Sequence, residues 1–387
     1  MSIETGTGVD TRAAALAAHG ASGGEIDELL AYAENAFSLE GAPALPLDDE
    51  PCAAAWEGYA ARASEIGVVP ALREVLPQLR FPIQAGIAAT DAYRAATLRG
   101  EAAEHPGGGV EFHDEAGVRL FMHPTPAGRI AVIVARARAD FESLIRALTR
   151  RNEPEAVPAS MGACIVGGYN DWARVAALRA GWERENPAAA PGAWGAFFRE
   201  RVVPRRELYQ DRFIILSSGP YSAVSASDLG MEEAEWAGKS LAIRLEHECA
   251  HYVTRRVFGS MRNSLHDELI ADWRGIRAAE GRFRADWLLR FMGLENHPEY
   301  RQGGRLQNYR GTPPLSDGAF AALRSMLVAA AATLEAVDAS IPREPAAEAR
   351  ALCALAALSV EELAGPGAVE RFHAAYAAAG APEPAAA

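Results

Sequence analysis

The sequence HECAH at residues 247–251 is the pattern in this chain most suggestive of chemistry, an HExxH motif within a helical run from about residue 231 to 258. Histidines four residues apart on a helix project from one face, so the imidazoles of His247 and His251 can bind one metal ion. Glu248 is turned about 100° from His247 and can take a proton from a water on that metal. The motif therefore predicts a metal-dependent hydrolase.

Further acidic residues follow on the next expected helix, which Ser264 opens with a Ser-x-x-Asp capping box. Two helices joined by a short turn pack antiparallel, which brings the start of the second beside the first. Glu268 is then placed as a third metal ligand, and Asp272 as acceptor for the second ring N–H of a ligand histidine. Two alternatives stay open: Asp267 or His266 could replace Glu268 as ligand, and Asp272 could lie on a solvated face.

HExxH followed by Glu-x-x-x-Asp on the next helix resembles the gluzincin metallopeptidases, the thermolysin-like class. The resemblance covers residues 247–272 and implies one zinc ion per chain. It implies that the zinc ligands are His247, His251 and Glu268. It also implies that Glu248 is the general base and that Asp272 is the carboxylate partner of a ligand histidine. The chain departs from the class at Asp267, where thermolysin-like sequences often have Asn.

Hydrolysis through a tetrahedral intermediate also needs a hydrogen-bond donor for the developing oxyanion. The segment 295–309 is rich in glycine and polar donors. Its candidates for this role are His297, Tyr300, Arg305 and Tyr309. We assign the role to Tyr309 and His297. Cys249, between the two histidines, is expected to pack in the helix core and not to bind metal.

Composition limits the classes of partner. The chain has 387 residues and a formal net charge of −13, and its first sixty residues hold eleven acids and one base, Arg12. This balance argues against binding to nucleic acid or an anionic membrane, and it leaves the acidic N-terminal region as a candidate surface for a protein partner. No apolar run approaches the roughly 18 residues of a membrane span, and the N-terminus is unlike a signal peptide. We therefore expect a cytoplasmic protein that acts on a peptide or small amide.

The elements around these motifs predict an α+β fold that is predominantly helical, with a small antiparallel β-sheet and a metallopeptidase-like pair of active-site helices. Three short β-like runs, at residues 110–113, 118–122 and 130–134, predict an antiparallel meander because their connections are hairpin-sized. The expected regions are a helical N-terminal region (1–105), an α+β metal-binding catalytic core (106–312), a helical C-terminal region (313–380) and a disordered tail (381–387).

Some interpretations remain open on the sequence alone. The apolar run at residues 212–217 is either an edge strand that holds an extended substrate, by resemblance to gluzincins, or an internal strand that supports the metal helix. Two histidines and a carboxylate also suit a non-haem iron enzyme. A third reading is a non-catalytic binding protein that keeps a metal for stability. Glu248 argues against the third reading, because a structural zinc site does not use a general base.

Overall fold

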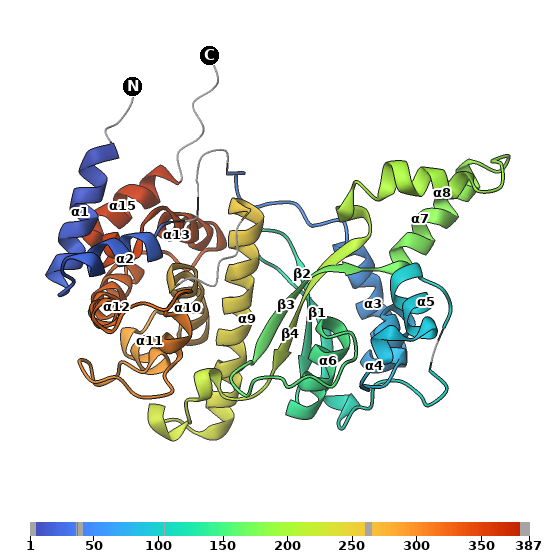
Figure 1. Cartoon of the computed structure of the whole chain (residues 1–387), viewed down its shortest axis with the longest axis horizontal. Coiled ribbons are helices and arrows are strands. Elements are labelled where there is room, and N and C mark those ends of the chain that lie inside the picture. The colour runs from blue at the N-terminus through green and yellow to red at the C-terminus, as the bar shows by residue number, and fades with distance from the viewer. Residues whose placement is uncertain (1–4, 36, 38–41, 104, 260–264, 380–387) are drawn as a thin grey trace, which may run out of the picture. The chain divides into compact units, whose positions relative to one another are not determined.

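The structure is a computed structural model that describes residues 5–35, 37, 42–103, 105–259 and 265–379. It is an α+β protein and predominantly helical, as predicted (Figure 1). Its α-helices are α1 (Thr5–Ala18), α2 (Gly24–Tyr32), α3 (Ala53–Ile66), α4 (Val68–Val75), α5 (Asp91–Arg99), α6 (Arg138–Thr149), α7 (Trp172–Glu185), α8 (Ala193–Phe197), α9 (Glu233–Phe258), α10 (Leu265–Glu280), α11 (Ala285–Met292), α12 (Asp317–Asp338), α13 (Pro345–Ala357), α14 (Val360–Ala364) and α15 (Ala368–Ala378). Its strands are β1 (Val118–His123), β2 (Ile130–Ala135), β3 (Ala163–Asn170) and β4 (Gln210–Ser217).

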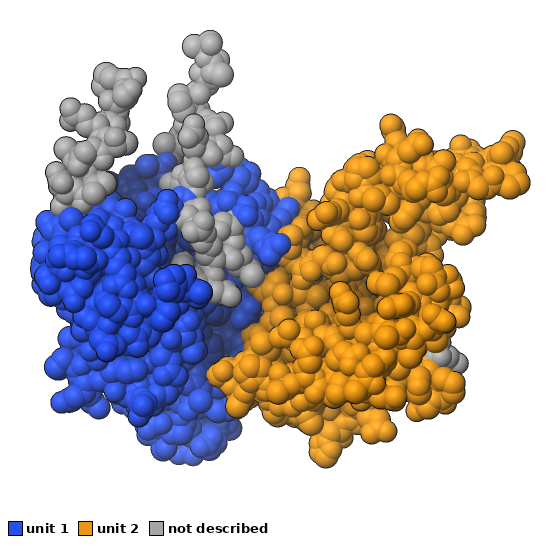
Figure 2. All heavy atoms as spheres, viewed as in Figure 1, with its two compact units in different colours: residues 1–47, 220–387 blue, residues 48–219 orange. Residues whose placement is uncertain are grey.

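The chain divides into two compact units, which Figure 2 colours separately. Unit 1 comprises residues 1–47 and 220–387, and unit 2 comprises residues 48–219. The expected boundaries near residues 105 and 312 do not coincide with this division. In unit 1 the N-terminal helices α1 and α2 pack with the C-terminal helices α12 and α14, and Arg12 pairs with the buried Glu361 at 2.7 Å. The expected tail at 381–387 lies outside the described residues.

Unit 2 contains a four-stranded sheet in the order β1-β2-β4-β3. β1 and β2 are antiparallel, as predicted, but β2 pairs with β4 in parallel, so the sheet is mixed and the expected meander is wrong. Residues 110–113 do not form a strand: the Val110 N–H donates to the Leu79 carbonyl and the His113 N–H to the Asp140 carboxylate. β3 was not foreseen, because Gly167 and Gly168 break its apolar pattern where its register with β4 shifts.

β4 lies between β2 and β3, and its residues from Phe213 to Leu216 are fully buried. A strand paired on both edges has no free backbone groups for an extended ligand, so the substrate-shelf interpretation of residues 212–217 is wrong. The face that carries Ile133 and Ile215 packs against apolar side chains of α3, α4 and α6, including Trp56. This apolar layer is the core of unit 2.

Unit 1 is built from α1, α2 and α9–α15. One of its helices, α12, is long and apolar enough to cross a membrane by length and composition alone, and 50% of that apolar window is buried within the protein. The sequence pattern predicts a helical region here but no apolar run of membrane-spanning length, because Arg324 and Ser325 interrupt the run. A core helix of this kind passes the same test, so α12 is weak evidence for a membrane. A capping box of Ser359 and Glu362 begins α14.

Candidate metal centre

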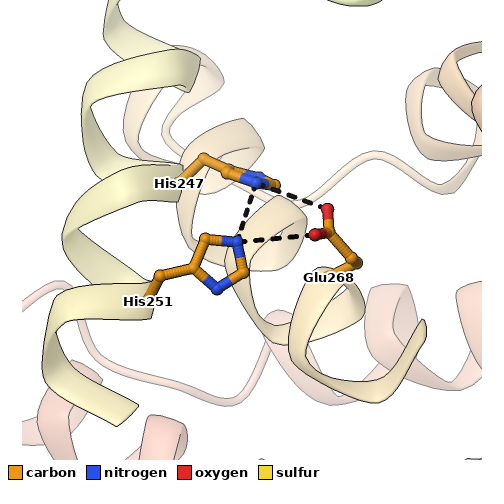
Figure 3. A group of neighbouring side chains, drawn as sticks. All are labelled: His247, His251 and Glu268. Atoms are coloured by element: carbon orange, nitrogen blue, oxygen red, sulfur yellow. Dashed lines mark hydrogen bonds and ion pairs between the residues drawn. The ribbon is translucent and has the colours of Figure 1, made fainter. Parts of the chain in front are cut away.

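The helix α9 carries the two histidines of the HExxH motif. It spans 26 residues and ends at Gly259, whose φ of 66° is left-handed and suits glycine. His247 and His251 are four residues apart, and both side chains leave the helix on the same side (Figure 3). Both are buried, with exposed fractions of 6% and 5%. The structure therefore places both imidazoles on one face of α9, as the helical spacing predicts, and it buries them.

The helix α10 runs antiparallel to α9 and packs closely against it. Gly275 makes this close approach possible, because a Cβ atom at that position would lie 2.6 Å from the Ile243 carbonyl oxygen. The contacts run in opposite directions along the two helices, with Asp272 opposite His247 and Asp267 opposite His251. This arrangement brings the first turn of α10 to the histidines. The capping residue predicted for this turn, Ser264, lies outside the described residues.

Glu268 completes a group of three ligand atoms with the two histidines (Figure 3). The two Nε2 atoms lie 3.1 Å apart, and each faces the Glu268 carboxylate, at 3.4 Å from His247 and 3.6 Å from His251. Donors bound at about 2.0–2.1 Å in a tetrahedral zinc site are about 3.3–3.4 Å apart. The spacing thus fits a single metal ion held by His247, His251 and Glu268.

A carboxylate faces the other ring nitrogen of each histidine. Nδ1 of His247 lies 2.9 Å from Asp272 Oδ1, and Nδ1 of His251 lies 2.9 Å from Asp267 Oδ2. Neutral imidazoles that donate from Nδ1 keep a lone pair on Nε2. Two lone pairs and the Glu268 carboxylate then converge on one point, an arrangement that a cation stabilises.

Asp272 belongs to a buried polar cluster that holds it in its ionised form. Its Oδ1 accepts a hydrogen bond from Tyr221 at 2.7 Å, and its Oδ2 is paired with Arg305, which also donates to the Tyr221 hydroxyl at 2.7 Å. Burial raises the pKa of Asp272, but Arg305 and the hydrogen bonds from His247 and Tyr221 outweigh it and lower the pKa to about 2. The carboxylate is therefore ionised and able to orient His247.

Asp267 has a simpler environment. It is fully buried, and its second oxygen accepts a hydrogen bond from the Thr254 hydroxyl at 3.1 Å. Burial lowers the pKa of His251, but Asp267, Glu268 and Glu248 together raise it to about 10. The potential at His251 is therefore strongly negative, which favours a cation.

Glu248 is half-buried and forms no hydrogen bond or ion pair with the residues that the structure describes. Its charge is the smallest of the contributions that raise the pKa of His251. A carboxylate that follows a candidate ligand histidine in the chain and pairs with none of the described residues is suited to accept a proton.

Tyr309 also reaches the ligand group. It lies in the 3₁₀ turn Arg305–Tyr309 and hydrogen-bonds to Glu268, and burial is the main cause that raises its pKa. The Tyr32 hydroxyl at the end of α2 donates to the Tyr309 carbonyl at 2.6 Å. The N-terminal helices therefore help to position a residue of the site.

The other sequence candidates lie elsewhere. His297 is exposed, and the structure does not bring it to the ligands; its backbone N–H donates to the Leu294 carbonyl. The Tyr300 hydroxyl donates to the Gly304 carbonyl at 2.7 Å. His266 faces the Leu355 carbonyl at 2.9 Å, so it is not the third ligand. Cys249 is buried outside the ligand group, as expected, and its burial raises its thiol pKa.

Sequence reasoning missed the Tyr221 hydroxyl and the role of Asp267 as partner of His251. Tyr221 lies 51 residues from Asp272 in the chain, so no local pattern indicates their contact. Asp267 immediately precedes Glu268 in the first turn of α10. It could have been found by asking which carboxylate accepts the Nδ1 hydrogen bond of the second histidine.

The fold and the site together define an α+β protein with a buried group of two histidines and one glutamate able to bind a metal ion. The chain belongs to a family of unknown function, DUF7005, whose pattern matches residues 14–367. No curated protein and no solved structure matches the chain.

Proposed function

We propose that this protein is a metal-dependent hydrolase, a zinc metallopeptidase of gluzincin type that cleaves a peptide or amide bond. The observation that carries the proposal is the convergence of His247, His251 and Glu268 within 4.8 Å of one another, next to Glu248. Both histidines also have a carboxylate behind Nδ1, as zinc-ligating histidines usually do.

The donor set favours a catalytic centre over a structural one. Structural zinc sites are usually closed by four protein ligands, whereas catalytic sites have three and keep a position open. Among the described residues only three donors form the group. A metal held there would polarise a substrate carbonyl and make a water more acidic. Two histidines with one carboxylate also suit iron, but the adjacent Glu248 supports hydrolysis.

The residues of the chain then take separate roles. Glu248 accepts the proton of the attacking water and passes it to the leaving amine. The Tyr309 hydroxyl, which bonds to Glu268 in the structure, would turn to donate a hydrogen bond to the oxygen that becomes negative as the carbonyl is attacked. Asp272 and Asp267 keep the two imidazoles in the tautomer that leaves Nε2 free to bind metal.

The test combines metal analysis with one substitution. We expect the purified chain to bind about one zinc ion, and Glu248→Gln to keep that metal while losing turnover of a peptide library by about 10²-fold or more. Glu233→Gln is the matched control, because Glu233 is an exposed glutamate in the first turn of the same helix. Equal turnover in wild type and Glu248→Gln would refute the hydrolase. Iron in place of zinc, with oxygen consumption, would support the oxygen-dependent alternative.

A further inference from the structure

Unit 2 contains a cleft with a volume of about 760 Å³ that the proposed hydrolase reaction does not use. Small-molecule sites usually have volumes of about 300–1,000 Å³. α5 lines one side of the cleft, the end of α6 another and β3 a third. The cleft is therefore large enough for a metabolite-sized ligand and is formed by elements of the unit's own fold.

The charged side chains of the cleft are all basic. Arg94 on α5 and Arg151 after α6 line it, and no acidic residue does. Neither guanidinium forms an ion pair or hydrogen bond with a residue that the structure describes, and both residues are exposed. In a chain with a net charge of −13, two such arginines in one cleft provide a local site for an anion.

The backbone of Arg151 has a left-handed conformation, which favours glycine over arginine. Its φ of 52° is left-handed, and it occupies the position after a helix where glycine is most common. The next residue, Asn152, is fully buried; its side chain donates to the carbonyls of Gln78 and Phe81 and accepts from the Tyr93 hydroxyl. This buried asparagine maintains the turn, so Arg151 is held in a strained backbone conformation.

The cleft also offers an apolar surface and backbone donors. Leu98, which lines it, is a large apolar side chain that is 63% exposed. Gly167 and Gly168 of β3 are exposed at the register shift, and β3 pairs only with β4 among the described strands. An aromatic or aliphatic group can therefore lie against Leu98 while its anionic end faces the arginines.

We propose that this cleft binds a small organic anion, a carboxylate or phosphate ester with an apolar group, through Arg94 and Arg151. Arginine binds both kinds of anion with paired N–H donors. The site lies wholly within unit 2 and does not involve the residues of the metal centre.

The test is calorimetric titration of the full chain with three probes: phenyl phosphate, phenylacetate and the cation phenethylamine. We expect saturable binding of at least one anionic probe and none of the amine. The stronger of the two anions identifies the phosphate or the carboxylate as the preferred group. Charge-assisted hydrogen bonds of about 1.5–3 kcal/mol predict that Arg94→Gln/Arg151→Gln weakens binding about 10-fold or more.

Two further variants separate binding from folding. Arg151→Gly should weaken binding without lowering Tm, because glycine suits the left-handed conformation. Arg119→Gln, an exposed arginine on β1 outside the cleft, should bind like wild type. A His247→Ala/His251→Ala variant should also bind the anion normally, which separates this site from the metal centre. Absence of anion binding at millimolar concentrations, or unchanged binding in Arg94→Gln/Arg151→Gln, would overturn the proposal.

Discussion

The two carboxylates behind the histidines should respond very differently to the same substitution by asparagine. In Asp267→Asn the amide can turn so that its oxygen accepts from His251 Nδ1 and its NH₂ donates to the Thr254 hydroxyl. The Thr254 hydroxyl lies 3.0 Å from the His251 carbonyl as well as 3.1 Å from Asp267, so in the variant its proton can go to that carbonyl and its oxygen can accept from the amide. The tautomer of His251 is preserved and only a charge is lost. We expect metal affinity to fall by about 10-fold, the low end for such changes.

In Asp272→Asn, neither orientation of the amide satisfies both neighbours of the side chain. If the amide oxygen faces His247, its NH₂ group meets the Arg305 guanidinium, which also only donates. If the amide turns, the NH₂ group faces His247 Nδ1 and selects the tautomer that cannot bind metal through Nε2. We expect metal affinity to fall by about 100-fold. Leaving Arg305 buried without its partner should also cost about 3–5 kcal/mol of folding stability.

The assay is chelator competition for zinc, with urea unfolding of the metal-free proteins as the measure of stability. Asp272→Asn should be the weaker binder and the less stable of the two. If Asp267→Asn lost more metal affinity than Asp272→Asn, the reasoning would be wrong. Thr254 would then not compensate for the first substitution, and Tyr221 and Arg305 would not prevent compensation for the second.

Two other predictions follow from the packing. Gly275→Val should weaken metal binding more than 10-fold, measured by the same competition, because its side chain meets the Ile243 backbone and separates α9 from α10. In unit 2, burial and then the neighbouring Asp171 raise the pKa of Asp211 to about 8. Because the pKa of Asp211 is higher in the folded than in the unfolded chain, its contribution to the free energy of unfolding is fully present below about pH 4. That contribution is lost as the pH rises through 8. Urea unfolding at pH 5–7 should show a fall of about 1 kcal/mol per pH unit that Asp211→Asn removes.

The part of the site that the sequence predicts is the part built from one pair of neighbouring helices. His247 and His251 follow from helical spacing, and Glu268 and Asp272 follow from an antiparallel turn to the next helix. Each step uses contacts close in sequence. The orientation of Asp272 could not be predicted in this way, because Tyr221 and Arg305 reach it from 51 and 33 residues away.

In the sheet, too, only the pairing between neighbouring segments of the chain could be predicted. The β1 and β2 hairpin was predictable because a short turn joins two β-like runs. The parallel pairing of β2 with β4 joins residues about eighty positions apart, such as Ile133 and Ile215. Periodicity identified β4 as a buried strand but gave no partner for it. The two compact units could not be read from the sequence for the same reason, since α1 and α2 pack on helices from the other end of the chain.

The charges of the site explain why the helix pair needs contacts with residues distant in the sequence. Four carboxylates surround the two histidines, those of Glu248, Asp267, Glu268 and Asp272, and Arg305 is the cation paired with one of them. Burial of this much negative charge is unfavourable unless positive charge is added. Arg305 offsets one carboxylate and fixes its direction, and a divalent ion between the Nε2 atoms would offset two more. In the proposed metal centre Arg305 and Tyr221 therefore act on Asp272, whose pKa they lower, and through it they orient His247. If the group binds a metal ion, that ion should also stabilise the fold, because it offsets the buried carboxylates.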